Sequence, residues 1–342
     1  MRVARLRTPP PGFWETLAET APNASFFLTP RYASIAARAY GAALELFAFE
    51  CEDGVRVAVP ARRLPGPRLR RTYVCPGGGL PGGLIADAPL EPRRSAAVLS
   101  ALARLPDAAF RFTFDPRDAA QLPHAPERTL RSDRFCVLDL TGGFTRVETE
   151  RFAKDFREGC RKAARRGVTA APERTRAAFE DFARLHAQGS EAWDAESRVP
   201  AAFFEACSDD ATAADSPLEL VLARDAGGAA VAGVLGVRRG DTFTCWLAAM
   251  DRRARPLAPS TAAYRSAVER ACEMGASRFL LGASGGIASV EAFKRSLGAE
   301  AVERHLHLEV RGALREAARR SRVLGRWVQG LARGTRAPGP AV

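Results

Sequence analysis

Lys294 stands at a position from which a lysine could do chemistry. The apolar run 279–281 ends at Gly282, a loop of small residues follows, and a short helix then carries Phe293 and Lys294 before it stops at Gly298. A lysine on a short helix beside the end of a buried strand can reach a ligand that lies across the sheet edge, where its ammonium group would stabilise negative charge. The alternative is a solvated surface lysine.

A second group of basic residues occupies the segment 156–168. Arg157, Arg161 and Arg165 are spaced at i, i+4 and i+8, so a helix places them on one face, and Gly167 is placed to stop that helix. Like charges on one face repel each other unless an anion or an acidic partner lies opposite. The spacing favours an anion site, with a solvated helical face as the alternative.

The composition predicts a two-domain protein with polyanionic partners. The chain has 342 residues, of which 46% are hydrophobic, enough for two cores of ordinary size. The net charge is +12, and Lys154, Lys162 and Lys294 are the only lysines among 51 lysine and arginine residues. Arginine binds phosphate with two parallel hydrogen bonds, which suits RNA, nucleotide diphosphates or anionic lipid. A GC-rich genome would produce the same arginine excess without any functional demand.

Neither a metal site nor a membrane span is expected. Seven cysteines are scattered singly, which predicts reduced core thiols. His305 and His307 alternate with apolar residues on a predicted half-buried strand, and no third ligand accompanies them. No stretch approaches the roughly 20 apolar residues of a spanning helix, and the first residues contain no apolar signal core, so we expect a soluble or at most peripheral protein.

One order of elements occurs twice along the chain. Helices are followed by a hairpin with a glycine turn, then by a helix, a strand and a return strand, first around Gly54 and again around Gly228. The repeat predicts two copies of one α+β fold, each a mostly antiparallel mixed sheet flanked by helices. The predicted units are an N-terminal domain at 1–145, a C-terminal domain at 146–310 and a basic amphipathic tail at 311–342.

Four segments together resemble the Fem-like branch of the GNAT acyltransferase superfamily, which contains peptidoglycan-bridge aminoacyltransferases and related tandem-GNAT proteins. These segments are FREGCRKAARRGV, VLARDAGGAAVAGVLGV, TFTCWLAAMD and LLGASGGIASVEAFKRSLGAE. The similarity covers most of the chain and is clearest from about 150 to 310. It implies two tandem GNAT-like domains around a cleft, with the C-terminal domain catalytic, and transfer of an acyl or aminoacyl group to an amine.

The resemblance also implies roles for individual residues. In the Fem enzymes the donor is an aminoacyl-tRNA and the acceptor is a peptidoglycan precursor that bears a sugar-diphosphate. By this likeness Lys294 would neutralise negative charge at the reacting carbonyl or the tRNA end, and Phe293 would position it. Arg157, Arg161 and Lys162 match the basic region that such proteins present toward the acceptor.

The loop after the third antiparallel strand bears on the choice of donor. GNAT proteins that use acetyl-CoA cradle its pyrophosphate there on a glycine-containing loop, whose backbone N–H groups face the phosphates. Here the loop 251–260 has no glycine and two prolines, which favours a donor other than CoA. Arg252, Arg253 and Arg255 could still hold phosphates through their side chains.

The sequence is compatible with three functions. We prefer aminoacyl-tRNA-dependent transfer to an amine, ahead of acyl-CoA-dependent N-acyl transfer and of a catalytically silent protein that binds RNA or membrane. No cofactor is expected beyond the donor, whose predicted site also includes Ser284 and Trp246, although Trp246 could equally pack in the core. The tail could lie on a membrane, along RNA or on its own domain, so the predicted location is the cytoplasm, free or at the inner face of the membrane.

Overall fold

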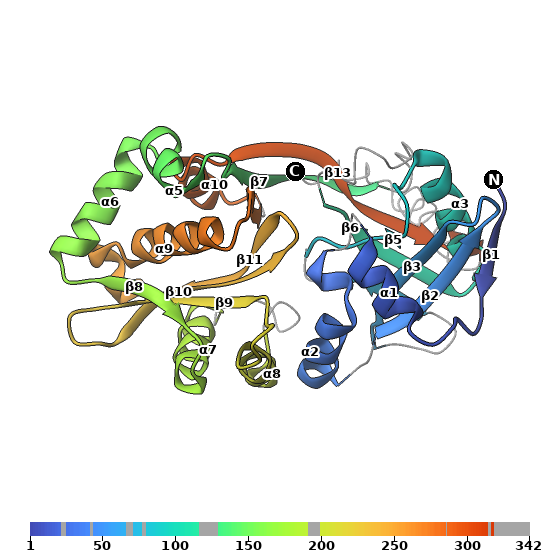
Figure 1. The fold of residues 1–342 in the computed structure, drawn as a ribbon, viewed down its shortest axis with the longest axis horizontal. Helices are drawn as coiled ribbons and strands as arrows, with labels where there is room; N and C mark the ends of the chain where they lie inside the picture. Colours follow the sequence, from blue (N-terminus) through green and yellow to red (C-terminus); the bar gives the residue numbers. More distant parts are fainter. Residues whose placement is uncertain are drawn as a thin grey trace, which may run out of the picture.

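The computed structural model describes most of the chain. It covers residues 1–21, 25–41, 44–65, 71–76, 80–115, 129–190, 199–284, 286–313 and 316–317, and for 129–133, 190 and 303–308 only the backbone is described. Figure 1 shows two halves side by side, with helices packed on the strands of each half.

The first half begins with helices and continues with the predicted hairpin. Thr29 caps α2, because its side chain accepts a hydrogen bond from the backbone N–H of Tyr32, and Pro30 occupies the first helical position. The elements are β1 (Val3–Leu6), α1 (Phe13–Thr20), η1 (Phe26–Leu28), α2 (Pro30–Tyr40), β2 (Leu44–Cys51), β3 (Arg56–Arg63), β4 (Arg71–Cys75), β5 (Ile85–Ala86), α3 (Pro92–Ala103), β6 (Ala108–Thr113) and β7 (Thr129–Asp139).

The second half repeats this order after a short helical linker. Its hairpin β9–β10 turns where the Asp225 carboxylate accepts the backbone N–H of Gly227 and of Ala229. The elements are α5 (Gly143–Arg146), η3 (Val147–Arg151), α6 (Lys154–Arg165), β8 (Thr169–Glu173), α7 (Arg176–Ser190), α8 (Ala201–Ala211), β9 (Leu218–Arg224), β10 (Ala230–Arg239), β11 (Thr242–Met250), η4 (Arg252–Leu257), α9 (Pro259–Glu273), β12 (Arg278–Ala283), α10 (Ala288–Ser296) and β13 (Glu300–Arg311).

The strands of the two halves join into one sheet. Its order is β1-β2-β3-β4-β6-β13-β7-β12-β11-β10-β9-β8, with β5 attached to β3. The halves exchange strands where they meet, because β7, which precedes the predicted boundary at 145, pairs with β12, whereas β13 from the end of the second half pairs with β6. Figure 1 shows the long β13 crossing from one half to the other. The predicted tandem α+β architecture is confirmed, and the two sheets are continuous.

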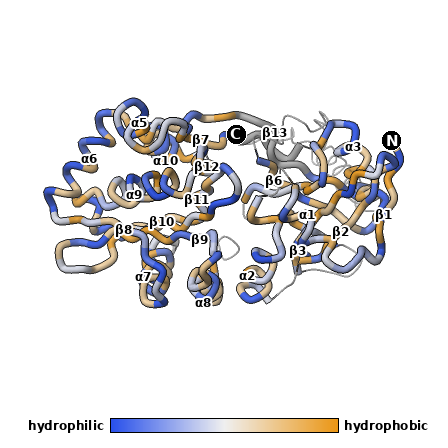
Figure 2. Tube along the Cα trace, in the orientation of Figure 1, coloured by the Kyte–Doolittle hydropathy of each residue, from blue (hydrophilic) through white to orange (hydrophobic). Residues whose placement is uncertain are grey.

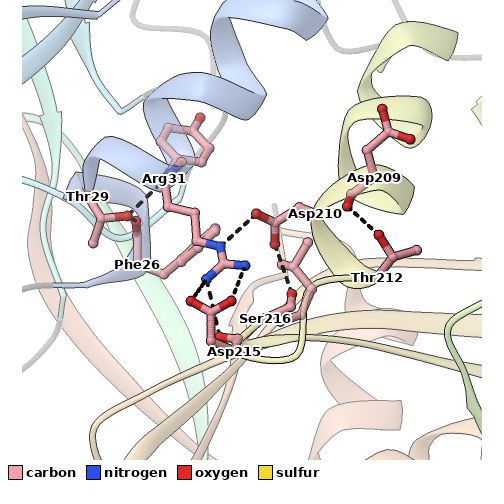
Figure 3. Close-up of polar contacts among 10 residues, drawn as sticks. Phe26, Thr29, Arg31, Asp209, Asp210, Thr212, Asp215 and Ser216 are labelled. Atoms are coloured by element: carbon pink, nitrogen blue, oxygen red, sulfur yellow. Dashed lines mark hydrogen bonds and ion pairs between the residues drawn. The ribbon is translucent and has the colours of Figure 1, made fainter.

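Helices α2 and α8 hold the two halves together on one side of this sheet. Arg31 on α2 donates from Nε to Asp210 at 2.6 Å and from Nη1 to the Asp215 carboxylate at 2.9 Å (Figure 3). Arg38, two turns further along α2, bonds Asp209 at 2.5 Å. These charge-assisted bonds fix the orientation of α2 against α8.

An aromatic cluster lies beside these ion pairs and buries the contact between the halves. The Trp246 ring on β11 packs edge-to-face against Phe27 at 5.1 Å and against Phe203 at 4.8 Å, with Phe26 and Tyr32 within 6 Å. Edge-to-face pairs of this kind add stability beyond the area that they bury. Trp246 therefore occupies the packing position that the sequence left open as an alternative to donor binding.

Figure 2 shows how hydropathy is distributed over these elements. Apolar residues follow the central strands of both halves, whereas hydrophilic residues run along α6. The second half has a core between the sheet and α9, which includes Phe156, Phe243, Phe279 and Leu297. Since Leu297 closes α10, this core anchors the C-terminal end of the helix that carries Lys294.

Gly298 provides a test of how tightly α10 is held. It has a φ of +83°, and a Cβ at this position would lie 2.4 Å from the carbonyl oxygen of Arg151. Gly298→Ala should therefore lower the free energy of unfolding by the roughly 1–2 kcal/mol of a left-handed alanine plus a further ~1–3 kcal/mol for the forced displacement. Urea unfolding measures both.

The matched control is Gly228→Ala in the β9–β10 hairpin. Gly228 has a similar φ of +82°, and a Cβ there would meet nothing within 4 Å. This variant should show only the conformational cost. Equal losses of stability in the two variants would contradict the close contact between Gly298 and Arg151.

Candidate functional site

The Lys294 side chain is buried at the end of β12. Only 5% of the residue is exposed, which excludes the solvated surface lysine that the sequence allowed. Its Nζ donates to the carbonyl oxygens of Gly282 at 3.0 Å and of Ala283 at 2.8 Å. An ammonium group removed from water needs such acceptors, so these two carbonyls hold the charge at a fixed point beside the sheet.

Strands β11 and β12 separate at this point. They pair in parallel only from Thr242 to Thr244 on β11 and from Arg278 to Leu280 on β12. Beyond these residues β11 continues along β10 and β12 continues along β7. Within the described residues no strand pairs with the β12-facing edge of β11 after Thr244. Its backbone groups are therefore available to a ligand.

A β-bulge lies at the start of the separated part of β11. Leu235 of β10 lies opposite Leu247, and Gly236 lies opposite Cys245, so Trp246 is the extra residue. Bulges increase the local twist and turn neighbouring side chains to new directions. Here Trp246 packs against the core between the halves, whereas Cys245 packs against the core beneath α9.

Cys245 and Tyr264 lie on the Lys294 side of β11. The Cys245 thiol is 3.6 Å from the hydroxyl of Tyr264 on α9. Burial raises the pKa of the Cys245 thiol above its usual value, and the hydrogen bond with Tyr264 and the charge of Lys294 offset part of that rise. Burial also raises the pKa of Tyr264 well above its usual range, so the phenol stays protonated. Both residues are nevertheless not fully buried, so a ligand at the separated strands could touch them.

Phe293 belongs to a row of rings that positions α10. Its ring packs edge-to-face against Tyr264 at 5.2 Å and against Phe156 of α6 at 6.0 Å, and Phe156 in turn contacts Phe152 at 4.7 Å. These rings fix α10 between α6 and α9. The predicted positioning role of Phe293 remains a prediction, and this packing is its physical basis.

Ser284 lies just beyond the carbonyls that bind Lys294. It is 6% exposed, its hydroxyl is 3.8 Å from the Cys136 thiol, and its carbonyl accepts the backbone N–H of Ile287. Ser284 thus supports the turn into α10, and the predicted contact with the donor is not tested by this geometry.

The loop after β11 forms the short helix η4, and Asp251 is its N-cap. The Asp251 carboxylate accepts the backbone N–H of Arg253 at 2.9 Å and bonds the Arg253 side chain at 3.0 Å. Its own carbonyl accepts the N–H of Ala254. The side-chain bond to Arg253 keeps the pKa of Asp251 below its usual range, so the carboxylate is charged. Arg252 and Arg255 are exposed.

The basic residues of α6 divide between a pocket and the open surface. Arg157 and Arg161 line a pocket of about 460 Å³ between α6 and α9, together with Arg265, Glu148 and Glu269. Arg157 donates to the carbonyl of Phe152 at 2.7 Å, and Arg265 bonds Glu148 at 2.8 Å. Lys162 does not line the pocket and is exposed.

Several predicted features fall on residues that the structure does not describe. The side chains of His305 and His307 lie outside the described set, as does most of the predicted tail. In the part of the chain that is described, no three His, Cys, Asp or Glu side chains converge as a metal site would require, and no helix is long and apolar enough to cross a membrane.

Known proteins share the domain and the fold of this chain. Residues 150–295 match the family model of the acetyltransferase (GNAT) domain. The crystal structure of FemX superposes with a TM-score of 0.65 at 14% identity, covering 92% of this chain and 98% of FemX. The chain has a Fem-like, tandem GNAT fold. The match of its second half to the acetyltransferase domain supports an acyltransferase, and the predicted resemblance is confirmed.

Two further structures share the fold. L-PGS from Bacillus licheniformis has a TM-score of 0.54 at 13% identity, covering 89% of this chain and 92% of its own. A conserved protein of unknown function from Bacteroides thetaiotaomicron has a TM-score of 0.55 at 12% identity, covering 90% of this chain and 99% of its own. None of the curated proteins compared with the chain matches it by sequence.

The proximity of Lys294 to Cys245 can be tested by thiol labelling. Because the ammonium lowers the pKa of Cys245, Lys294→Ala should raise that pKa and slow alkylation of Cys245 by iodoacetamide at mildly alkaline pH. Peptide mass spectrometry measures the rate. Cys160 is the internal control, since its pKa depends on burial and on Arg265 and Glu148. An unchanged Cys245 rate would contradict the proximity.

Proposed function

We propose that this protein transfers an aminoacyl group from an aminoacyl-tRNA to an amine acceptor, with Lys294 at the reacting carbonyl. The observation that carries the proposal is the buried Lys294 ammonium, held by two backbone carbonyls where β11 and β12 separate. A charge fixed in advance need not reorganise when negative charge develops on the substrate, so it lowers the barrier efficiently.

The chemistry needs little more than position and this cation. The amine attacks the ester carbonyl, whose oxygen gains negative charge beside Lys294. The tetrahedral intermediate then collapses, the ester C–O bond breaks, and the leaving hydroxyl departs with the proton that the amine gives up. An ester is already activated toward aminolysis, so alignment on the free edge of β11 supplies much of the acceleration.

The η4 loop supports tRNA over CoA as the donor. Arg253 and Ala254 already give their backbone N–H groups to Asp251, and Pro256 has none to give. The charged Asp251 carboxylate at the start of η4 also repels an approaching phosphate. Arg252 and Arg255 remain exposed for the phosphates of a larger donor.

The α6 cations support an anionic acceptor. Arg161 is exposed at the pocket between α6 and α9. It makes no hydrogen bond or ion pair with the described residues. With Arg157 beside it and Lys162 on the neighbouring face, this end of α6 suits a diphosphate or a carboxylate. We place the activity in the cytoplasm, where charged tRNA is found.

A transfer assay tests the proposal. The purified protein is incubated with tRNA carrying labelled amino acids and with two amines, a lysine-bearing pentapeptide and glucosamine. The expected result is label on an amine, abolished by RNase. Label transferred from acetyl-CoA and not from charged tRNA would replace this proposal with acyl-CoA-dependent transfer. Transfer from neither donor would overturn both and favour a silent binding protein.

Lys294→Ala is the decisive variant. Loss of a fixed charge at the reacting carbonyl should lower kcat on the order of a hundredfold to a thousandfold. Lys154→Ala is the matched control, because Lys154 is exposed on α6 and its one ion pair among the described residues is with Glu158 at 3.9 Å. Wild-type kcat in a folded Lys294→Ala protein would remove the catalytic assignment.

Arg161→Ala should act on the acceptor instead. Without this guanidinium the KM for an anionic acceptor should rise about tenfold, while kcat stays close to the wild-type value. Arg176→Ala on α7, whose partner is Glu180 at 3.5 Å, controls for the loss of one surface arginine. A rise in the KM for the donor alone would assign Arg161 to the tRNA.

A further inference from the structure

The Tyr264 hydroxyl is poorly satisfied for a group so deep in the protein. Within the described residues its one hydrogen-bond partner is the Cys245 thiol, at 3.6 Å. A phenol is a strong donor and a thiol is a weak acceptor, and buried polar groups usually find better partners. The hydroxyl therefore has donor capacity left for a ligand.

This hydroxyl and the Lys294 ammonium have neighbours in common. The charge of Lys294 lowers the pKa of the Cys245 thiol, which bonds the hydroxyl, and the Tyr264 ring packs against Phe293, which precedes Lys294 on α10. Cys245 is also the first residue of β11 beyond the last pair with β12. The hydroxyl and the ammonium thus both flank the place where the two strands separate.

We propose that Tyr264 is a second catalytic residue, whose hydroxyl donates a hydrogen bond to the oxygen of the reacting carbonyl. The proposal rests on acyl transfer at Lys294 and not on the identity of the donor. During attack the amine nitrogen forms a bond to the carbonyl carbon, and the carbonyl electron pair moves onto oxygen. Lys294 and Tyr264 share that charge until the bond to the leaving group breaks, and the leaving group then departs with the proton lost by the amine.

The surroundings of the hydroxyl suit this role. Its high pKa keeps it protonated, so it can act only as a donor to an oxyanion. The ring is held by Phe293 on one side and by the core beneath α9, so the hydroxyl keeps its direction. The Cys245 thiol is the present hydrogen-bond partner of the hydroxyl, and as a weak acceptor it competes little with an oxyanion.

Tyr264→Phe tests the proposal, because it removes the oxygen and keeps the ring that packs on Phe293. The assay uses the full chain with charged tRNA and, separately, acetyl-CoA as donors, and with the pentapeptide and glucosamine as amines. We expect kcat to fall on the order of a hundredfold with KM for both substrates unchanged, since the lost bond forms only as charge develops. The thermal unfolding midpoint should match that of the wild type.

Tyr73→Phe is the matched control. It removes a phenol hydroxyl from the first half, where that hydroxyl bonds Glu45 at 3.1 Å, so kcat should stay within about twofold of the wild-type value. A purely structural role of the Tyr264 hydroxyl would instead lower the unfolding midpoint of Tyr264→Phe and leave its kcat at the wild-type value.

The outcomes separate this inference from the proposed function. If the wild type transfers an acyl group from either donor and Tyr264→Phe has the same kcat, or loses its fold, the role of Tyr264 is overturned and Lys294 keeps its own. If the wild type transfers from neither donor, the proposed function fails and this inference fails with it.

Discussion

Burial of one ammonium group constrains the whole second half of this protein. Moving a lysine charge out of water costs several kcal/mol unless acceptors replace the lost hydration. The carbonyls of Gly282 and Ala283, at the end of β12, do so. The separation of β11 from β12, the turn through Ser284 and the ring row beside Phe293 all serve to keep that charge where the strand ends.

The joined sheet extends this constraint across both halves. β12, whose end binds Lys294, pairs with β7 from the first half, and β13, which follows α10 directly, pairs with β7 and β6. The element carrying the lysine is therefore tied at both ends to strands of the first half. On the other side of the sheet, Arg31 and the rings around Trp246 close the contact between α2 and α8. The first half therefore supports the second through these strand pairs and this helix contact.

Charge is distributed to match this architecture. The ammonium of Lys294 lies at the end of β12, and Arg157 and Arg161 line the pocket between α6 and α9. Asp251 places a negative charge at the start of η4. The net charge of the chain does not reveal these positions.

The sequence by itself determined what depends on neighbours along the chain. The repeat order, the Thr29 cap, the glycine turn at Gly228 and a lysine on a short helix after a buried strand all follow from local periodicity and turn chemistry, and the fold class follows from their order. The strand exchange and the site around Lys294 were decided only in three dimensions. Tyr264 on α9 contacts Cys245 on β11, which lies 19 residues earlier in the chain. Trp246 is turned toward the first half by a bulge. No local pattern predicts such contacts, because long-range packing and the register of paired strands bring these side chains together.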